Sequence, residues 1–272
     1  MFILPDITRA ALAALPLPAN EADLRDLFFR APQEFNQLVP QNDNGLTVLK
    51  LYLHWLEDMH ARYEALGIPE VVYQDNLKDI ALWCEDFTAK TGLPGIKEWR
   101  WVGKSLRMEL FRLGRLQFEP ITLGEALTLH GQTFPAGTPA LSVHIPAGEP
   151  LDTEACLSAF QQAEVFFPRY LGKSYPLFYC HSWLLAPSLA EVLPETSRIM
   201  QFQQLFEIIH TEQDRQAEER VFGFLADDPA IYPENTSLQR TLKSYLLSGK
   251  PAMAACAVRL RESTYLEESP DA

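Results

Sequence analysis

The chain has 272 residues, which is enough for two domains of ordinary size. Hydrophobic residues make up 47% of it and charged residues 22%, a composition that excludes extensive disorder and fibrous repeats. The formal net charge of -13 at pH 7 argues against nucleic acid or an anionic membrane as a partner, because both require a cationic surface.

The N-terminal residues lack the basic segment and sustained apolar run of a secretory signal, and no apolar stretch approaches the length of a membrane span. We therefore expect a cytoplasmic protein. Its cysteines are scattered without a CxxC pair, at Cys84, Cys156, Cys180 and Cys256. This pattern predicts reduced, mostly buried thiols and neither a disulfide framework nor a zinc site.

The hydrophobic pattern is helical up to about residue 111. Apolar residues recur at intervals of three or four over residues 46–66 and again over residues 69–92, and a third long helix is expected over residues 96–110. Residues 1–112 are therefore predicted to form a helical domain.

Beyond Gly114 polar and apolar residues alternate, as they do in half-buried strands. Strands are expected over residues 115–119, 126–130 and 140–145. A long amphipathic helix follows, with Asp152 as its N-cap and Gly172 at its end. Residues 177–185 read as a buried strand parallel to residues 140–145, because a helix separates the two.

The remaining pattern is less regular. It predicts a helical turn between Pro187 and Pro194, a helix over residues 199–209, a strand over 220–225, a helix over 238–246, a strand or helix over 252–260, and a frayed acidic tail from Glu262.

This order of strands and helices resembles the core of the GNAT N-acetyltransferase superfamily. More specifically, the chain resembles bacterial two-domain proteins with an acyltransferase-like N-terminal domain and a GNAT-like C-terminal domain, and the resemblance covers most of its length. It lies in the motifs Phe111-Arg-Leu-Gly-Arg-Leu-Gln-Phe-Glu119, Val143-His-Ile-Pro-Ala-Gly148, Cys180-His-Ser-Trp-Leu-Leu185, Ser197-Arg-Ile-Met-Gln-Phe-Gln203 and Arg220-Val-Phe-Gly223. The resemblance implies an α+β fold, in which the helical domain precedes a GNAT-like mixed β-sheet flanked by helices over residues 113–272.

The resemblance also implies an acyl donor, acetyl-CoA or another acyl-CoA, whose pantetheine lies between the parallel strands. Its pyrophosphate is expected at backbone N–H groups of the loop and helix start that follow residue 145. The residues assigned to this site are Ile145, Ala147, Gly148, Glu149 and Leu151. The implied acceptor is a small-molecule or peptide amine that attacks the thioester directly, and the oligomeric state is left open.

We predict His144 as the catalytic base, because imidazole titrates near neutrality and this residue ends a strand beside the expected cleft. Cys180 and Ser182 share one face of the next strand, and we expect them to line the same cleft as proton or oxyanion donors. No metal is expected, since His54 and His60 are six residues apart and miss the i, i+4 spacing of helical ligands.

Three functions remain open from the sequence. The first is a GNAT-like N-acyltransferase. The second is a catalytically degenerate GNAT-like protein that binds a ligand or partner, suggested by a loop in which Gly148 stands among Glu149, Asp152 and Glu154. The third is an enzyme with a covalent intermediate on Cys180 or Ser182.

Overall fold

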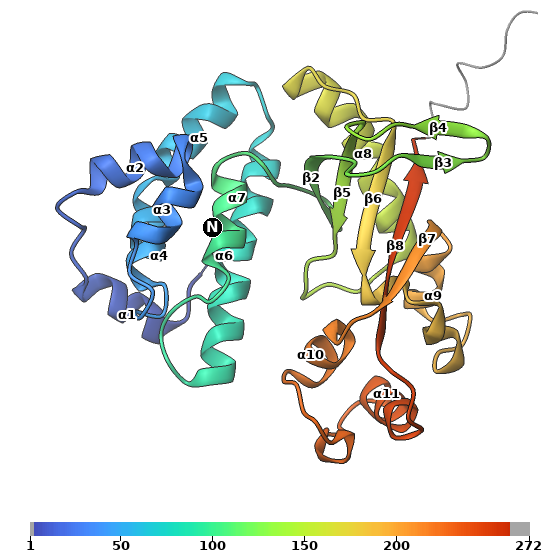
Figure 1. Cartoon of the computed structure of the whole chain (residues 1–272). Coiled ribbons are helices and arrows are strands. Elements are labelled where there is room, and N and C mark those ends of the chain that lie inside the picture. Colours follow the sequence, from blue (N-terminus) through green and yellow to red (C-terminus); the bar gives the residue numbers. More distant parts are fainter. Residues whose placement is uncertain (1–2, 262–272) are drawn as a thin grey trace, which may run out of the picture. The chain divides into compact units, whose positions relative to one another are not determined.

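The computed structural model describes residues 3–261, and the acidic tail from Glu262 lies outside them (Figure 1). The chain forms two compact units. The first contains the chain up to Glu119 together with Ile145–Glu149 and Phe166–Gly172, and the second contains the remainder. These units are defined by contacts and interleave along the chain, so the division into domains at residue 112 stays a prediction.

The first unit is helical up to residue 106, as predicted. Its helices are α1 (Asp6–Ala14), α2 (Glu21–Arg30), α3 (Pro32–Leu38), α4 (Leu46–His54), α5 (Leu56–Ala65), α6 (Glu70–Thr91) and α7 (Trp99–Leu106). The single helix expected over residues 46–66 is instead two helices, α4 and α5. They divide at the buried Trp55, whose N–H donates to the carbonyls of both Leu51 and Tyr52, the tightened geometry of a helix end.

A mixed sheet has the strand order β1-β2-β5-β6-β8-β7. Its strands are β1 (Phe111–Leu113), β2 (Leu116–Thr122), β5 (Pro139–His144), β6 (Leu177–Ser182), β7 (Glu207–Gln213) and β8 (Met253–Leu260), while β3 (Leu127–Leu129) and β4 (Gln132–Phe134) form a separate hairpin. The pair β5 and β6 is parallel, as predicted, and β8 is antiparallel to both β6 and β7. The predicted α+β fold with a mixed sheet is confirmed.

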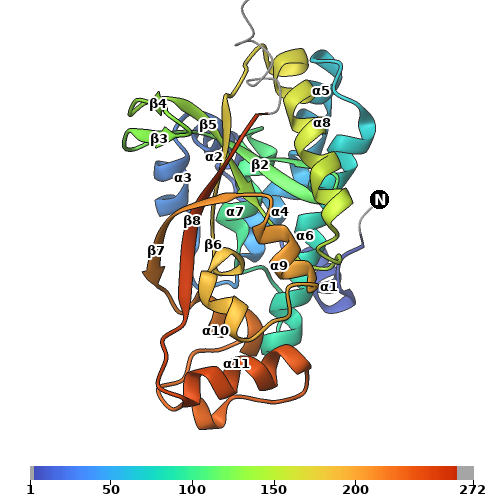
Figure 2. The same cartoon turned by 90° about the vertical axis from the view of Figure 1, so that its right-hand side faces the viewer.

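The helices of the second half are α8 (Thr153–Leu171), α9 (Arg198–Gln203), α10 (Gln216–Phe222) and α11 (Ser237–Leu247). Helices α8 and α9 lie on one side of the sheet (Figure 2). The ring of Phe160 on α8 contacts Phe178 on β6, with centroids 4.8 Å apart. Within the described residues, no helix combines the length and the apolar character that crossing a membrane requires.

Two predictions in this half are wrong. Residues 220–225 were expected to form a strand, but Arg220 to Phe222 end α10, which is closed by Gly223 at a φ of 84°. The apolar run there packs as a helix end and loop. The helix expected over residues 199–209 ends at Gln203, and residues 207–209 begin strand β7. That strand was not predicted, because nearly all of its side chains are exposed and no alternation of polar and apolar residues marks it.

Strand β7 also contains an irregularity. Ile208 pairs with Ala257, but His210 pairs with Cys256, so Ile209 is an extra residue in the ladder. This is the pattern of a β-bulge.

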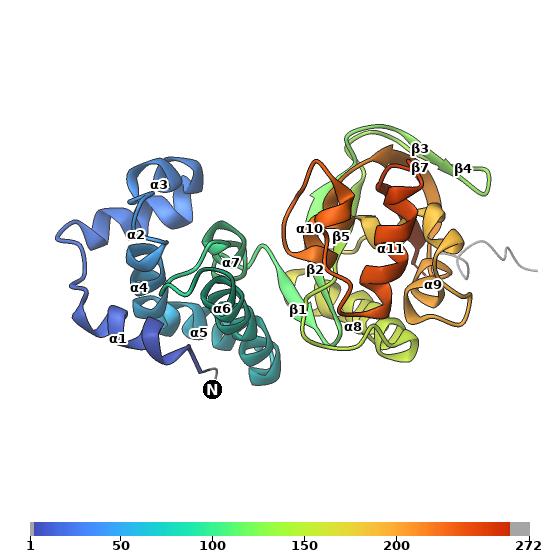
Figure 3. The ribbon, with the colours of Figure 1, turned by 90° about the horizontal axis from the view of Figure 1, so that it is seen from below.

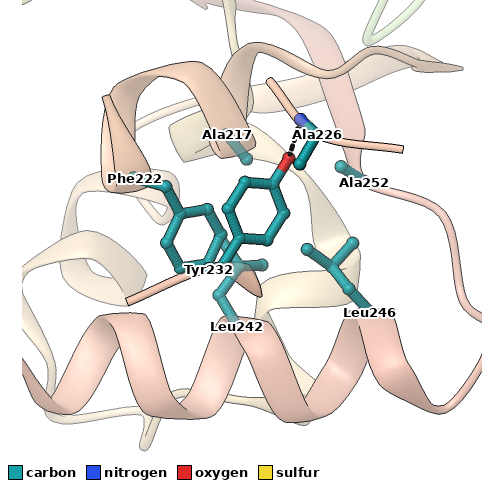
Figure 4. Close-up of a cluster of buried hydrophobic side chains, with 7 residues drawn as sticks. All are labelled: Ala217, Phe222, Ala226, Tyr232, Leu242, Leu246 and Ala252. Carbon is teal, nitrogen blue, oxygen red and sulfur yellow. Dashed lines mark hydrogen bonds between the residues drawn. The ribbon is translucent and has the colours of Figure 1, made fainter. Parts of the chain in front are cut away.

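Between β7 and β8 the chain makes an excursion of residues 214–252, which we call the α10–α11 segment. It lies beyond the end of the sheet where β7 ends and β8 begins (Figure 3). Its own small core consists of Ala217, Phe222, Ala226, Tyr232, Leu242, Leu246 and Ala252 (Figure 4). The rings of Phe222 and Tyr232 are stacked, with centroids 4.0 Å apart.

An ion pair supports this small core. The Arg215 guanidinium donates to both carboxylate oxygens of Glu218, over 2.8 and 2.7 Å. The Tyr232 hydroxyl donates to the same carboxylate over 2.5 Å and accepts the N–H of Ala226. Because Arg215 and then Tyr232 stabilise its charged form, the pKa of the nearly buried Glu218 lies below its ordinary value despite desolvation.

We therefore predict that Glu218→Gln lowers the free energy of unfolding at pH 7 by about 1–3 kcal/mol. A carboxyl whose pKa is lowered by folding contributes stability above its unfolded pKa and loses that contribution as the pH falls through the folded value. Urea unfolding should thus show the difference between variant and wild type shrinking as the solution becomes acidic. The exposed neighbour Glu219→Gln is the control, and a difference independent of pH would contradict the role of the ion pair.

Candidate functional site

The loop after β5 is held from behind by a buried arginine. Arg115 donates from Nη1 to the carbonyl of Pro146 over 3.0 Å and from Nη2 to the carbonyl of Glu149 over 2.9 Å. A trans peptide directs its C=O and its N–H in opposite directions. The Pro146 carbonyl faces Arg115, so the N–H of Ala147 points away from that side chain.

A second arginine neutralises the loop's acidity. Arg112, 2% exposed, donates to the Glu149 carboxylate over 2.8 Å, and its Nη1 lies 3.6 Å from a carboxylate oxygen of Asp79 on α6. Gln117 donates to the other oxygen of Asp79 over 2.6 Å. Burial raises the pKa of the Asp79 carboxyl, while Gln117 and Arg112 act in the opposite direction. The charge of Glu149 is thus engaged by an arginine.

The other acidic residues of this stretch lie at the start of α8. The Asp152 carboxylate accepts the N–H of Ala155 over 2.9 Å, so it caps the helix as predicted. Glu154 is exposed in the first turn. Of the remaining residues assigned to acyl-CoA, Ala147 and Gly148 are exposed and Ile145 and Leu151 are half-buried. Gly148 has a φ of 92°, which favours glycine.

Strands β5 and β6 place their side chains in a definite register. Leu141 pairs with Phe178 and Ser142 with Tyr179, and both strands continue beyond these pairs. Aligned residues of neighbouring strands share a face, and side chains alternate along each strand. His144 therefore lies on the same face as Ser142 and Tyr179.

The prediction that Cys180 and Ser182 line a cleft with His144 is wrong, because this register puts them on the opposite face. Cys180 is 0% exposed and Ser182 is 6% exposed. Burial raises the pKa of the Cys180 thiol, which disfavours a thiolate. The Ser182 hydroxyl accepts the N–H of Leu184 and caps the short helical turn that follows β6.

The face that carries His144 and Tyr179 continues across β8 and β7, and we call it the open face. His181 on β6 and His210 on β7 both pair with Cys256 on β8, one on each side. The Tyr179 hydroxyl donates to the Cys256 sulfur over 2.9 Å. Titratable side chains from three strands therefore gather on one surface.

The most specific contact on the open face joins His181 to Glu212. The Nε2 of His181 lies 2.8 Å from a carboxylate oxygen of Glu212. A ring nitrogen of His181 and single carboxylate oxygens of Glu212 and Asp214 all lie within 4.8 Å of one another. A carboxylate that accepts the Nε2 proton fixes the ring and leaves Nδ1 as the acceptor, which is the arrangement of a general base.

The same three groups are of the kinds that bind divalent cations, nitrogen and carboxylate oxygen. In the structure the ring of His181 is already engaged by Glu212. The expectation that the protein uses no metal stays a prediction.

The sequence contains a pattern that could have identified His181 as a site residue. The residue follows Tyr179 at the alternating position, and it lies within the Cys180-His-Ser motif. Glu212 gave no comparable signal, because it lies in a continuously polar stretch and reaches His181 across the intervening strand β8.

The arrangement around Arg115 predicts the effect of removing it. Arg115→Met removes both donors to the loop carbonyls, and we expect a loss of about 1.5–3 kcal/mol in the free energy of unfolding. Hydrogen exchange by mass spectrometry should show faster exchange in residues 145–149. The control is Arg30→Met, whose ion pair with Asp26 is exposed on both sides and should change stability by less than about 0.5 kcal/mol. Unchanged exchange in the loop would contradict the role of Arg115.

Family models match both halves of the chain. Residues 3–108 match the N-acyltransferase N-terminal domain, and residues 110–258 match the GNAT-like C-terminal domain. A comparison with curated proteins gives no significant match.

Solved structures of acyltransferases have the same fold. One, in complex with CoA and 10C-teicoplanin, superimposes with a TM-score of 0.75 at 22% identity, over 96% of this chain and 90% of that one. A mutant acyltransferase with octanoyl-CoA gives a TM-score of 0.73 at 22% identity, over 96% of this chain and 90% of that one. Since the GNAT-like match spans more than half of the sequence, this chain belongs to the family of proteins with a GNAT-like C-terminal domain.

Proposed function

We propose that the protein is an N-acyltransferase that moves an acyl group from acyl-CoA to an amine. The observation that carries this proposal is the pair formed by His181 and Glu212 on the open face, beside the carboxyl-terminal ends of the parallel strands β5 and β6. A base at that position can take the proton of an amine as it attacks a thioester.

The loop of Ile145–Glu149 supports binding of the donor. Arg115 holds its carbonyls, the N–H of Ala147 points the other way, and helix α8 starts shortly afterwards. Backbone N–H groups beside a helix start suit the pyrophosphate of CoA. The residues proposed to bind acyl-CoA are Ile145, Ala147, Gly148, Glu149 and Leu151.

The acidity of this loop was the reason to consider a degenerate protein. Glu149 is paired with Arg112, and Asp152 is used in capping α8. Neither carboxylate therefore acts as an isolated negative charge against a phosphate, which favours the enzyme over the degenerate alternative.

The proposed donor is a medium-chain acyl-CoA. Its support is that similar acyltransferases were crystallised with octanoyl-CoA and with decanoyl-CoA and teicoplanin. The proposed acceptor is a small-molecule or peptide amine. The proposed location of the reaction is the cytoplasm.

The chemistry is direct transfer. The amine nitrogen forms a bond to the thioester carbonyl carbon, His181 accepts the amine proton at Nδ1, and the carbon–sulfur bond breaks to release the CoA thiolate, which takes up a proton. Glu212 stabilises the imidazolium that forms on His181. A covalent route through Cys180 or Ser182 is disfavoured, because both side chains are buried on the opposite face.

Calorimetric titration with decanoyl-CoA tests the donor. We expect saturable binding, and Arg115→Met should weaken it because the loop loses its support. The control Arg30→Met should bind like wild type. The absence of detectable binding heat at millimolar decanoyl-CoA would contradict the acyltransferase proposal.

A comparison of two histidines tests the base. His144, the base expected from the sequence, lies on the same face and remains a proposed contributor. We predict that His181→Gln lowers kcat by about 100-fold or more with little change in decanoyl-CoA affinity, while His144→Gln lowers it less than tenfold. Release of free CoA in the presence of an amine measures both. A larger loss of kcat in His144→Gln than in His181→Gln would identify His144 as the base.

A further inference from the structure

An open cavity of about 490 Å³ lies at the end of β7. Its walls come from the last residues of β7, from α10, from the loop of residues 226–229, and from the turn of residues 249–252 that leads into β8. This volume falls in the range of small-molecule sites, roughly 300–1,000 Å³. The cavity is therefore large enough for a substrate and belongs entirely to the second unit.

Asp214 connects this cavity with the proposed base. Its side chain lines the cavity, and its carboxylate belongs to the group of atoms within 4.8 Å of one another that includes His181 and Glu212. A molecule held in the cavity can thus present a functional group to His181.

The cavity has a preformed wall. The Glu218 carboxylate accepts hydrogen bonds from the Arg215 guanidinium and from the Tyr232 hydroxyl. That hydroxyl also accepts the N–H of Ala226 (Figure 4). Ala226, Glu218 and Arg215 all line the cavity. A substrate therefore meets a wall that is already ordered, which reduces the entropic cost of binding.

The charges of the wall favour a cation. Its two basic side chains are already engaged, Arg215 with Glu218 and Lys250 with Glu191. Asp214 and Asp227 add two further carboxylates. The net charge of -13 on the whole protein adds a long-range attraction for cations.

The wall also has an apolar part. Ala226, Pro229, Leu246, Pro251 and Ala252 line the cavity, and the exposed Phe224 and Leu225 directly precede Ala226 in the chain. A ligand with only a charge would leave this surface unused.

We propose that this cavity is the acceptor site and that it selects an amine which is cationic in solution and carries an apolar body. This assignment rests on the proposed acyl transfer and specifies its acceptor. The carboxylates hold the ammonium group at the inner end of the cavity. The ammonium group first loses one proton to solvent, the neutral nitrogen then attacks the thioester, and His181 takes the second proton as the amide forms. An added carboxylate on the acceptor is repelled by Asp214 and Asp227.

Tryptamine and tryptophan are matched probes, because they share an indole and an amine and differ by one carboxylate. With decanoyl-CoA as donor, we expect kcat/KM for tryptamine to exceed that for tryptophan at least tenfold. Asp227→Asn should raise the KM for tryptamine about threefold with kcat within twofold, because the residue attracts the ammonium group during binding and takes no part in the proton transfer to His181.

Asp228→Asn is the control. Asp228 neighbours Asp227 but caps the N–H of Ala230 and is not part of the cavity wall, and asparagine retains the capping ability. An equal rise in KM for both variants would assign the effect to the general charge of the surface and overturn the proposal. Equal use of tryptophan and tryptamine would also overturn it.

A failure of the acceptor assignment can be distinguished from a failure of the proposed acyl transfer. If decanoyl-CoA binds in calorimetry but neither amine is acylated, the donor site stands and the acceptor assignment is wrong. If decanoyl-CoA does not bind, the acyl transfer itself is wrong.

Discussion

The buried guanidinium of Arg112 constrains the whole region around the loop after β5. A charge that is removed from water needs partners close by, and here they come from two distant parts of the sequence. Asp79 on α6 lies on one side and Glu149 of the loop on the other. The loop conformation is therefore coupled to α6 within the first unit.

The contacts of the loop's carboxylates show why its composition alone does not define its charge environment. Glu149, Asp152 and Glu154 look repulsive to a pyrophosphate when the sequence is considered locally. The partner of Glu149 is 37 residues away in the chain, and the partner of Asp152 is a backbone N–H group. A charge in a sequence becomes favourable or unfavourable only through such neighbours, and most of them are set by tertiary structure.

The same distinction separates what could be predicted from what could not. Helices α6 and α8 and the parallel pair of β5 and β6 follow from long apolar periodicities and from the need for a crossover. The alternation within β6 correctly put Cys180 and Ser182 on one face. What it could not provide was the register between strands, which decides the side that faces His144. Strand β7 gave no signal, because a strand whose side chains are mostly exposed needs no apolar pattern.

The bulge at Ile209 has a consequence for the chemistry of the open face. In an uninterrupted ladder, Ile209 would pair with Cys256 and Thr211 with Ala254, and Glu212 would then point to the side of the sheet that carries Cys180. The extra residue shifts the phase of the strand by one, so that Glu212 points to the same side as His181. The acid that orients the histidine is thus supplied by a change of backbone phase: if the same residues paired without the bulge, the hydroxyl of Thr211 would replace this carboxylate opposite Ala254, while every side chain of β6 and β8 would stay in place.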